Sequence, residues 1–199
     1  VIRKVILQKN ENARGAVQTV INNELGEISR HLRGSIIEHN KDDEKWMVAD
    51  YPLLPVRRRF WEKVLPALDK TGTGSQLRNQ LRIVHEATKT TAEKPLGCVV
   101  PADYIYDQIA TKLLNSGAIG KDIYETISRL KAGDNDQKLQ SRLLALILLI
   151  SKLPTDIETG IAATADTLSD LLLENLQEGK HELRALVPKL LNQLVDDGL

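Results

Sequence analysis

The sequence predicts an all-α protein, and three observations support this fold class. Apolar residues recur at steps of three and four along most of the 199 residues, which is the spacing of a buried helix face. No stretch alternates apolar and polar residues beside an Asn-Gly or Asp-Gly turn, the pattern typical of a β-hairpin. Prolines and glycines lie between the periodic stretches, where helices start and stop. We therefore expect a set of packed helices.

The composition is typical of a globular protein. Hydrophobic residues make up 42% of the chain and charged residues 27%, and 27 Lys and Arg balance 27 Asp and Glu. The longest apolar run, 143–150, is far shorter than the ~18 residues of a membrane span. A single cysteine, Cys98, excludes an internal disulfide framework and a cysteine-based zinc site. No secretory signal is recognisable, so we expect a cytoplasmic protein that does not enter a membrane. The start at Val1, in mid-pattern, suggests a piece of a longer chain.

Several helices are predicted in the first part of the chain. The apolar spacing over 11–33 predicts one long helix, which Gly34 ends. The polar residues of 34–50 predict a loop. Pro55 is expected to begin the next helix, because proline fits the first turn. Its inward residues are predicted to be Val56, Phe60, Val64 and Leu68.

A turn and three further helices follow. The Thr-Gly-Thr-Gly-Ser segment at 71–75 predicts a turn whose hydroxyls cap a helix over about 75–89. Pro101 is expected to begin another helix, and 120–132 predicts a shorter one. Gly133 to Asp136 is the clearest linker, so we place a domain boundary there, between residues 1–133 and 134–199. The predicted inward residues are Leu77, Leu81, Val84, Ile105, Ile109, Leu113, Ile123, Ile127 and Leu130.

The second part of the chain predicts three helices. Residues 137–153 are apolar almost all round, which indicates a central buried helix. Helices are also predicted over 164–175 and 183–197, the latter with a break or a helix start near residues 185–188, because proline is best tolerated in a first turn. This order suits a helix-turn-helix core of the winged-helix type with a truncated wing, since the sequence stops where the first wing strand would begin.

Charge is distributed unevenly along the chain. Residues 51–89 carry 8 basic and 3 acidic groups, net +5, whereas 153–199 carry 3 basic and 9 acidic groups, net −6. Arg57, Arg58 and Arg59 form the densest basic cluster. Consecutive helical residues point in different directions, so these three arginines cannot all meet one phosphate. A phosphate or partner contact is one interpretation, and a solvated or interdomain ion-pair role is favoured over it.

Other candidate sites are few. Arg78 and Arg82 lie four residues apart, on one face of a predicted helix, where a guanidinium could reach the γ-phosphate of a nucleotide held by another domain. Their alternative is a pair of surface arginines beside Glu86. No histidine has a second ligand at a metal spacing, and no nucleophile-base set can be assembled, so we expect neither a metal site nor catalysis. The histidines are His31, His39, His85 and His181.

Four stretches carry a family resemblance. They are VADYPLLPVRRRFWE at 48–62, TGTGSQLRNQLRIVHE at 71–86, LQSRLLALILLISKL at 139–153 and AATADTLSDLL at 162–172. In this order they resemble the large P-loop ATPase of bacterial BREX phage-defence systems, the BrxC/PglY family. The resemblance implies an internal fragment whose ATP- and Mg²⁺-binding core lies upstream, with no cofactor in the fragment itself. It also implies contacts with that core and with other BREX proteins, indirect contact with DNA, and oligomers of the parent protein.

The resemblance also suggests roles for the two predicted regions. ATPases of the AAA+ type follow their nucleotide core with a helical lid and often a winged helix, so residues 1–133 would be lid-like and 134–199 helix-turn-helix. A lid arginine near the start of one helix touches the γ-phosphate; Arg78 is the first candidate for this sensor role and Arg82 the second. We therefore expect a non-catalytic fragment that senses nucleotide and docks defence partners. The alternative is a nucleic-acid-binding or transcription-regulatory module that uses Arg57–Arg59 and the C-terminal helices, which the net charge of −6 disfavours.

Overall fold

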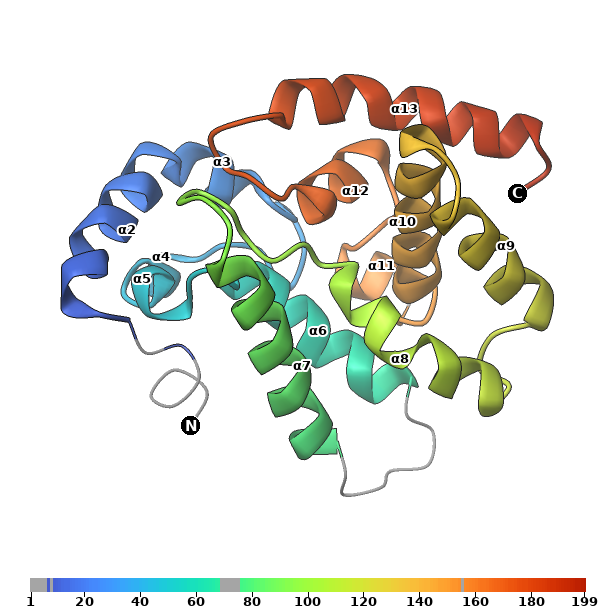
Figure 1. Ribbon diagram of the computed structural model, residues 1–199, viewed down its shortest axis with the longest axis horizontal. Helices are drawn as coiled ribbons and strands as arrows, with labels where there is room; N and C mark the ends of the chain where they lie inside the picture. The colour runs from blue at the N-terminus through green and yellow to red at the C-terminus, as the bar shows by residue number, and fades with distance from the viewer. Residues whose placement is uncertain (1–6, 8, 69–75, 155) are drawn as a thin grey trace.

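The fold class is confirmed: within the described part of the chain, all regular secondary structure is helical. Figure 1 shows the computed structural model, which describes residues 7, 9–68, 76–154 and 156–199. A single isolated antiparallel bridge, between Cys98 and Asn175, is the only β-type pairing in those ranges. None of the helices in those ranges has the length and apolar character needed to cross a membrane.

The first predicted helix is divided in two. α2 (Glu11–Asn23) and α3 (Leu25–Arg30) are separated at Glu24, whose φ of −104° and ψ of 13° leave the helical range. The expectation of one helix through residue 33 is therefore wrong. At the break, Glu24 accepts a hydrogen bond from Lys180, 2.8 Å away in a distant part of the chain.

Two short helices replace the loop predicted over 34–50. They are α4 (Lys41–Glu44) and α5 (Met47–Asp50). Asn40 starts α4 with a capping box: its side chain accepts from the Asp43 N–H, and the Asp43 carboxylate accepts from the Asn40 N–H. Met47 is buried, so this segment is fastened both by its cap and by its apolar side chain.

The next two helices agree with the sequence prediction. α6 (Pro55–Leu68) begins at the proline, and its predicted inward residues Val56, Phe60 and Val64 are buried. α7 (Gln76–Ala92) runs slightly further than predicted and buries Val84. The predicted turn at 71–75 lies outside the described residues, as do the side chains of 76–79.

Three helices then lead across the predicted domain boundary. They are α8 (Tyr104–Asn115), α9 (Lys121–Lys131) and α10 (Asn135–Ile150). The segment predicted as a linker is the cap of α10: Asp134 accepts from the Gln137 N–H, and the Gln137 side chain accepts from the Asp134 N–H. α9 and α10 pack against each other as an antiparallel pair. On α9, Ile123 was predicted to face inward, but its side chain is 48% exposed.

The last part of the chain contains α11 (Asp156–Thr159), α12 (Ala165–Leu172) and α13 (Lys180–Asp196). α13 runs through Pro188 without the predicted break. Its buried residues lie on both sides of the proline and pack towards α10 and α12. Apolar burial on either side thus holds the helix together where local propensity would end it.

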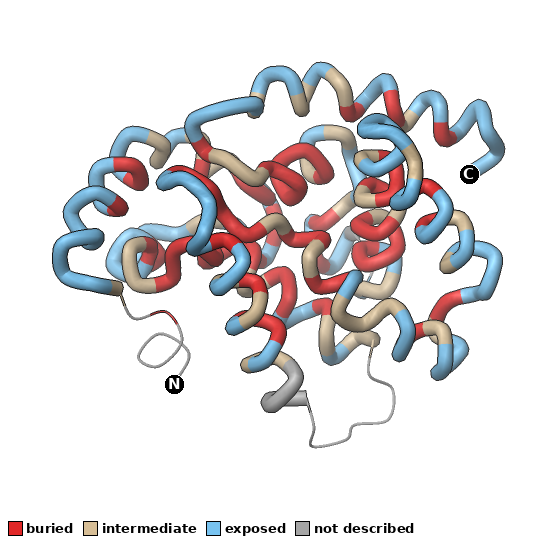
Figure 2. Tube along the Cα trace, in the orientation of Figure 1, coloured by how far each residue is buried: buried red, intermediate tan, exposed pale blue. Residues whose placement is uncertain are grey.

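The hydrophobic core crosses residue 133. Buried side chains of α6, α7, α8, α9, α10, α12 and α13 form one cluster, with α10 in the middle, as Figure 2 shows by its concentration of buried residues. The predicted division between 1–133 and 134–199 therefore lies within a continuous core. A second, smaller cluster lies under α2 and α5. Its buried members are Val17, Ile21, Ile28, Met47, Tyr51, Leu54, Val99, Leu173 and Leu176.

Candidate functional site

Arg57 is enclosed in the protein interior. Its side chain has no exposed surface, and its two terminal nitrogens donate to the carbonyl oxygens of Val100 (2.6 Å) and Asp170 (3.0 Å). Burial lowers the pKa of Arg57 to about 10, while Asp103 and Asp170 act against that shift. The guanidinium therefore stays charged at neutral pH and ties α6 to the segment at Val100 and to α12. Arg57 has no surface with which to meet a phosphate or a partner.

The two following arginines lie in other directions. Arg59 donates to both carboxylate oxygens of Asp43, at 2.6 and 2.7 Å, and so fastens α4 to α6. Arg58 donates to Glu62 at 2.7 Å and is near Asp50, at 3.6 Å. The three arginines do not converge, and their charges are already engaged within the molecule.

A second arginine network, which is partly buried, lies beside α10. Arg142 donates to both carboxylate oxygens of Asp103 (2.7 and 3.0 Å) and to Glu174 (2.5 Å). Burial lowers the pKa of Arg142, but Asp103 and Glu174 outweigh it, and the net shift is upward. This network is not among the sequence predictions, although Arg142, directly before the apolar run 143–150, is a signal that could have indicated an internal ion pair.

Glu27, His31 and Asp170 come together at the junction of α3, α12 and α13. One ligand atom from each lies within 4.8 Å of the others. Arg184 already binds both carboxylates, donating to Asp170 at 2.9 Å and to Glu27 at 3.1 Å. Arg30 adds a second positive charge 3.6 Å from Asp170. A cation would have to displace Arg184, so these residues do not fit Mg²⁺ or another metal ion.

Hydrogen bonding keeps the carboxylate of Glu27 in its charged form. Burial raises the pKa of Glu27, but hydrogen bonds from His31 and Arg184 outweigh it and bring that pKa to about 2. His31 is 1% exposed, and burial lowers its pKa, which favours the neutral imidazole. Arg184 thus balances the negative charges of Glu27 and Asp170, and the cluster joins α3, α12 and α13. We call it the Glu27 joint.

α7 differs from these networks because its basic residues face solvent. Arg82, His85 and Lys89 are exposed and lie at steps of three and four, on the face opposite the buried Ile83 and Ala87. Arg82 donates to the Gln108 side-chain oxygen at 3.2 Å, a neutral partner, and no carboxylate of the described residues compensates its positive charge. Arg78 belongs to the same stripe by its position in the helix, one turn earlier, but its side chain lies outside the described residues. We call Arg78, Arg82, His85 and Lys89 the α7 stripe.

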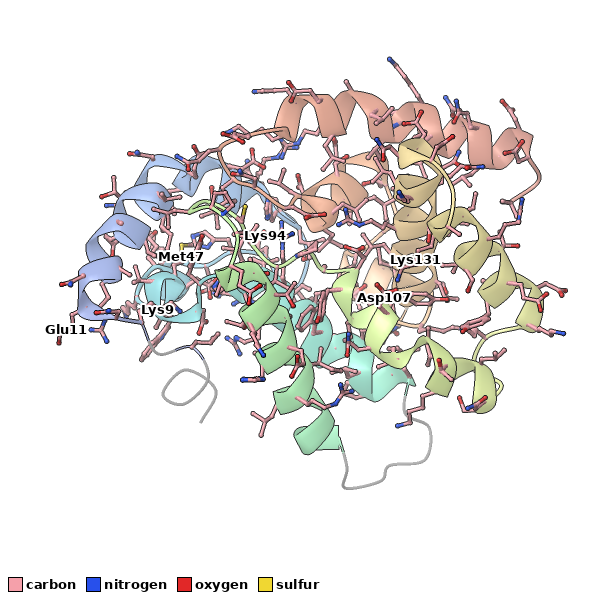
Figure 3. The ribbon with its side chains drawn as sticks, viewed as in Figure 1. Lys9, Glu11, Met47, Lys94, Asp107 and Lys131 are labelled. Carbon is pink, nitrogen blue, oxygen red and sulfur yellow. The ribbon has the colours of Figure 1, made fainter. Side chains whose placement is uncertain are left out.

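The C-terminal part of the α7 stripe, with His85 and Lys89, borders a cleft of about 520 Å³. Among the described residues, four basic side chains line it, namely Lys9, His85, Lys89 and Lys94. Two of them already have carboxylate partners, because His85 lies 3.3 Å from Glu86 and Lys94 lies 2.9 Å from Glu174. Lys9 donates to the carbonyls of Leu7 (2.8 Å), Ala49 (2.9 Å) and Tyr51, and burial lowers its pKa to about 8. Figure 3 labels Lys9 and Lys94 on the two sides of this region. We call it the basic cleft, whose apolar lining is Leu7, Ala13, Val17, Tyr51, Pro52, Ala92 and Leu96.

A neighbouring cleft of about 400 Å³ shares Thr91 and Lys94 with the basic cleft but has a different charge pattern. Its cations face carboxylates: Lys131 pairs with Asp107 at 2.6 Å, a pair labelled in Figure 3, and Lys94 pairs with Glu174 at 2.9 Å. This cleft is largely self-compensated. Within the described residues, Arg82 and Lys89 of the α7 stripe have no carboxylate partner, so they are the strongest candidates for an anionic contact.

Comparison with known proteins identified no relative of this chain. No protein-family model, curated protein or solved structure matches this chain. The likeness to the BREX ATPase family therefore stays a prediction, and the functional argument depends on the geometry of the chain itself.

Proposed function

We propose that this chain is a non-catalytic helical module of a BREX-type ATPase, in which the α7 stripe meets the γ-phosphate of a nucleotide held elsewhere in the protein. Partner docking in anti-phage defence would be its second task. The single observation that carries the nucleotide part is Arg82, an exposed guanidinium at a neutral partner, on a helix whose opposite face is fixed in the core. Such an arginine keeps its charge available for an incoming phosphate.

The internal use of the other arginines supports this choice. Arg57, Arg59, Arg142 and Arg184 all bind carbonyl or carboxylate oxygens within the fold. A guanidinium that already satisfies buried acceptors cannot move to a ligand without leaving them unpaired, at a cost of about 1–3 kcal/mol each. Arg82 carries no such constraint in the described part of the chain. Arg78, whose side chain is not described, remains the other candidate from the sequence.

The experiment measures ATP turnover and nucleotide binding by the complete ATPase. Arg82→Ala is expected to lower turnover at least tenfold, on the order of the loss from removing one transition-state donor. Arg78→Ala is tested in parallel. Arg129→Ala is the matched control, because Arg129 is an exposed arginine on α9, outside the α7 stripe.

Nucleotide affinity separates sensing from a structural role. A γ-phosphate contact weakens binding of a non-hydrolysable ATP analogue and leaves ADP affinity unchanged, because ADP lacks that phosphate. Equal weakening of both nucleotides by Arg82→Ala and Arg78→Ala, or wild-type turnover in both variants, would rule out the sensor role for the α7 stripe.

The rival proposal is a nucleic-acid-binding or transcription-regulatory module. It has less support, because the arginines at 57–59 on which it relies are engaged within the fold. Arg57 is buried, and Arg58 and Arg59 are paired with Glu62 and Asp43. Phosphate attraction supplies most non-specific affinity for DNA, and it needs uncompensated cations. Its signature would be affinity for duplex DNA that falls steeply with salt and is lost on Arg58→Ala.

A further inference from the structure

A buried tyrosine hydroxyl beside the second cleft has no hydrogen-bond partner. This cleft of about 400 Å³ is lined by residues of α7, α8 and α10, and we call it the α8 cleft. Tyr106 of α8 lines it and is only 4% exposed. Among the described residues, none forms a hydrogen bond with the Tyr106 hydroxyl. Buried polar groups are nearly always paired, so this hydroxyl indicates a partner that comes from outside the chain.

The hydroxyl remains a donor at neutral pH, and its surroundings can open. Burial, together with Tyr124 and Asp107, raises the pKa of Tyr106 to about 12. Asp107 lines the same cleft, and it pairs with Lys131, as Figure 3 shows by their labels. The two side chains of this ion pair are 49% and 58% exposed. Ion pairs this exposed contribute little to stability, so the pair can part and admit a ligand atom to the hydroxyl.

One cation of the α8 cleft has no carboxylate partner among the described residues. The other three are paired with carboxylates of the cleft itself, namely Lys94 with Glu174, Lys131 with Asp107, and Arg142 with Asp103 and Glu174. The remaining cation is Lys138, an exposed residue near the start of α10. Four cations and three carboxylates give the described lining a net charge of +1.

The rest of the lining suits the apolar body of a small molecule. Pro101, Tyr104 and Ala145 contribute apolar surface beside the Tyr106 ring. Tyr104 is itself stacked on Trp61, with ring centroids 6.4 Å apart, so its position is fixed by the core. The volume of the cleft lies within the range of about 300–1,000 Å³ that is usual for small-molecule sites.

We propose that the α8 cleft binds a small organic monocarboxylate that carries a second oxygen. The carboxylate meets Lys138, the second oxygen accepts a hydrogen bond from the Tyr106 hydroxyl, and the apolar body between them covers Pro101 and Tyr104. One negative charge matches the single unpaired cation. A dianion would add a second charge next to carboxylates that are already balanced, which disfavours it. This proposal is independent of the proposed function, because it involves neither a nucleotide nor the α7 stripe.

The test measures binding of three probes to the purified chain by ligand-observed NMR and calorimetry. 4-Hydroxybenzoate, 4-hydroxyphenylacetate and 4-hydroxycinnamate hold a ring hydroxyl at increasing distances from a carboxylate. At least one of them is expected to bind with a Kd of about 1 mM or below, as is usual for ligands of this size. Each probe is compared with the same molecule without the ring hydroxyl and with its uncharged amide.

Two variants test the two ends of the site separately. Tyr106→Phe removes the hydroxyl and should weaken binding of the hydroxylated probe about three- to tenfold, with no change for the probe that lacks the hydroxyl. Lys138→Met should weaken both carboxylates about two- to fivefold and leave binding of the amide unchanged. Tyr124→Phe on α9 and Lys63→Met on α6 are the matched controls, because neither residue lines the cleft.

The stability of Tyr106→Phe gives a second measurement that needs no ligand. Removing a buried hydroxyl that has no partner should leave the midpoint of urea denaturation unchanged or raise it. A lower midpoint would show that the hydroxyl is paired in the folded chain, and the proposal would then fail.

Two binding results would also overturn the proposal. The first is that none of the three probes binds at concentrations up to about 10 mM. The second is wild-type affinity for the hydroxylated probe in either variant, or equal weakening of both kinds of probe by Tyr106→Phe. Either form of the second result would place the bound probe away from the Tyr106 hydroxyl or from Lys138.

Discussion

The internal arginine network, which we define as Arg57 and Arg184, and the α7 stripe use the same kind of side chain in opposite ways. In the network, Arg57 and Arg184 donate to oxygens of other helices and segments, so their charge joins elements of the fold. On α7, Arg82 contacts a neutral amide and no carboxylate among the described residues, and Lys89 is exposed to solvent. Burial with complete partners makes an arginine structural, whereas exposure with no compensating carboxylate leaves it available for a ligand.

The largest expected effect is loss of stability on Arg57→Ala. The change leaves the buried carbonyls of Val100 and Asp170 without their donor and opens a cavity beside α6. We expect a loss of about 3–5 kcal/mol in the free energy of unfolding, measured by urea denaturation. A loss below about 1 kcal/mol would mean that the network is not structural. Arg57→Met, which keeps much of the volume, should lose less.

The next largest effect is expected at Arg184. Arg184→Met leaves the carboxylates of Glu27 and Asp170 close together without their shared cation. A loss of about 2–3 kcal/mol is expected from urea denaturation, at or below the about 3–5 kcal/mol for breaking a fully buried pair, because Arg184 is partly exposed. Restoring balance with Glu27→Gln in the same chain should recover part of the loss. Strict additivity of the two changes would contradict a direct pairing.

The same joint predicts a dependence of stability on pH. The folded-state pKa of Glu27, about 2, lies below its ordinary value of 4.5, so its contribution is full above about pH 5 and is lost as pH falls towards 2. The pKa of His31 is also lowered, by burial, so protonation of the unfolded chain begins to destabilise the fold below about pH 6.5. Urea denaturation from pH 8 to pH 3 should show stability falling throughout this acid range.

Two variants separate these contributions. Glu27→Gln should flatten the pH dependence below about pH 5, and His31→Gln should flatten the part between about pH 6.5 and pH 5. Unchanged pH profiles in both variants would show that the joint does not titrate with unfolding.

The smallest effect on stability is expected on the α7 stripe. Arg82→Ala and Lys89→Glu should change the free energy of unfolding by no more than about 0.5 kcal/mol, as is usual for exposed positions. Arg82→Ala is also the substitution expected to lower turnover. A stability loss comparable to that of Arg57→Ala would remove the distinction between the two regions.

Local signals explain most of what could be predicted. Pro55 begins a helix because its fixed φ and missing N–H suit a first turn, and the buried spacing of Val56, Phe60 and Val64 follows from the helical repeat. The Asp134 capping box was interpreted as a linker, because a helix cap and a flexible turn use the same small polar residues. For the candidate site, spacing alone placed Arg78 and Arg82 on one helix face.

Other features required knowledge of distant partners. Glu24 accepts a hydrogen bond from Lys180, and Glu27 accepts one from Arg184. These donors lie 156 and 157 residues away in sequence. The basic cleft depends equally on Lys9 lying near α7, which no local pattern indicates.

The sequence by itself determined that the chain is helical and where most helices begin, because helix periodicity and capping act over a few neighbouring residues. Only the tertiary structure decided that Arg57 is interior while Arg82 is exposed, and that α13 continues through Pro188. Charge compensation and burial are properties of groups brought together from remote segments. The same arginine can therefore serve the core or face a ligand, according to which oxygens the fold places beside it.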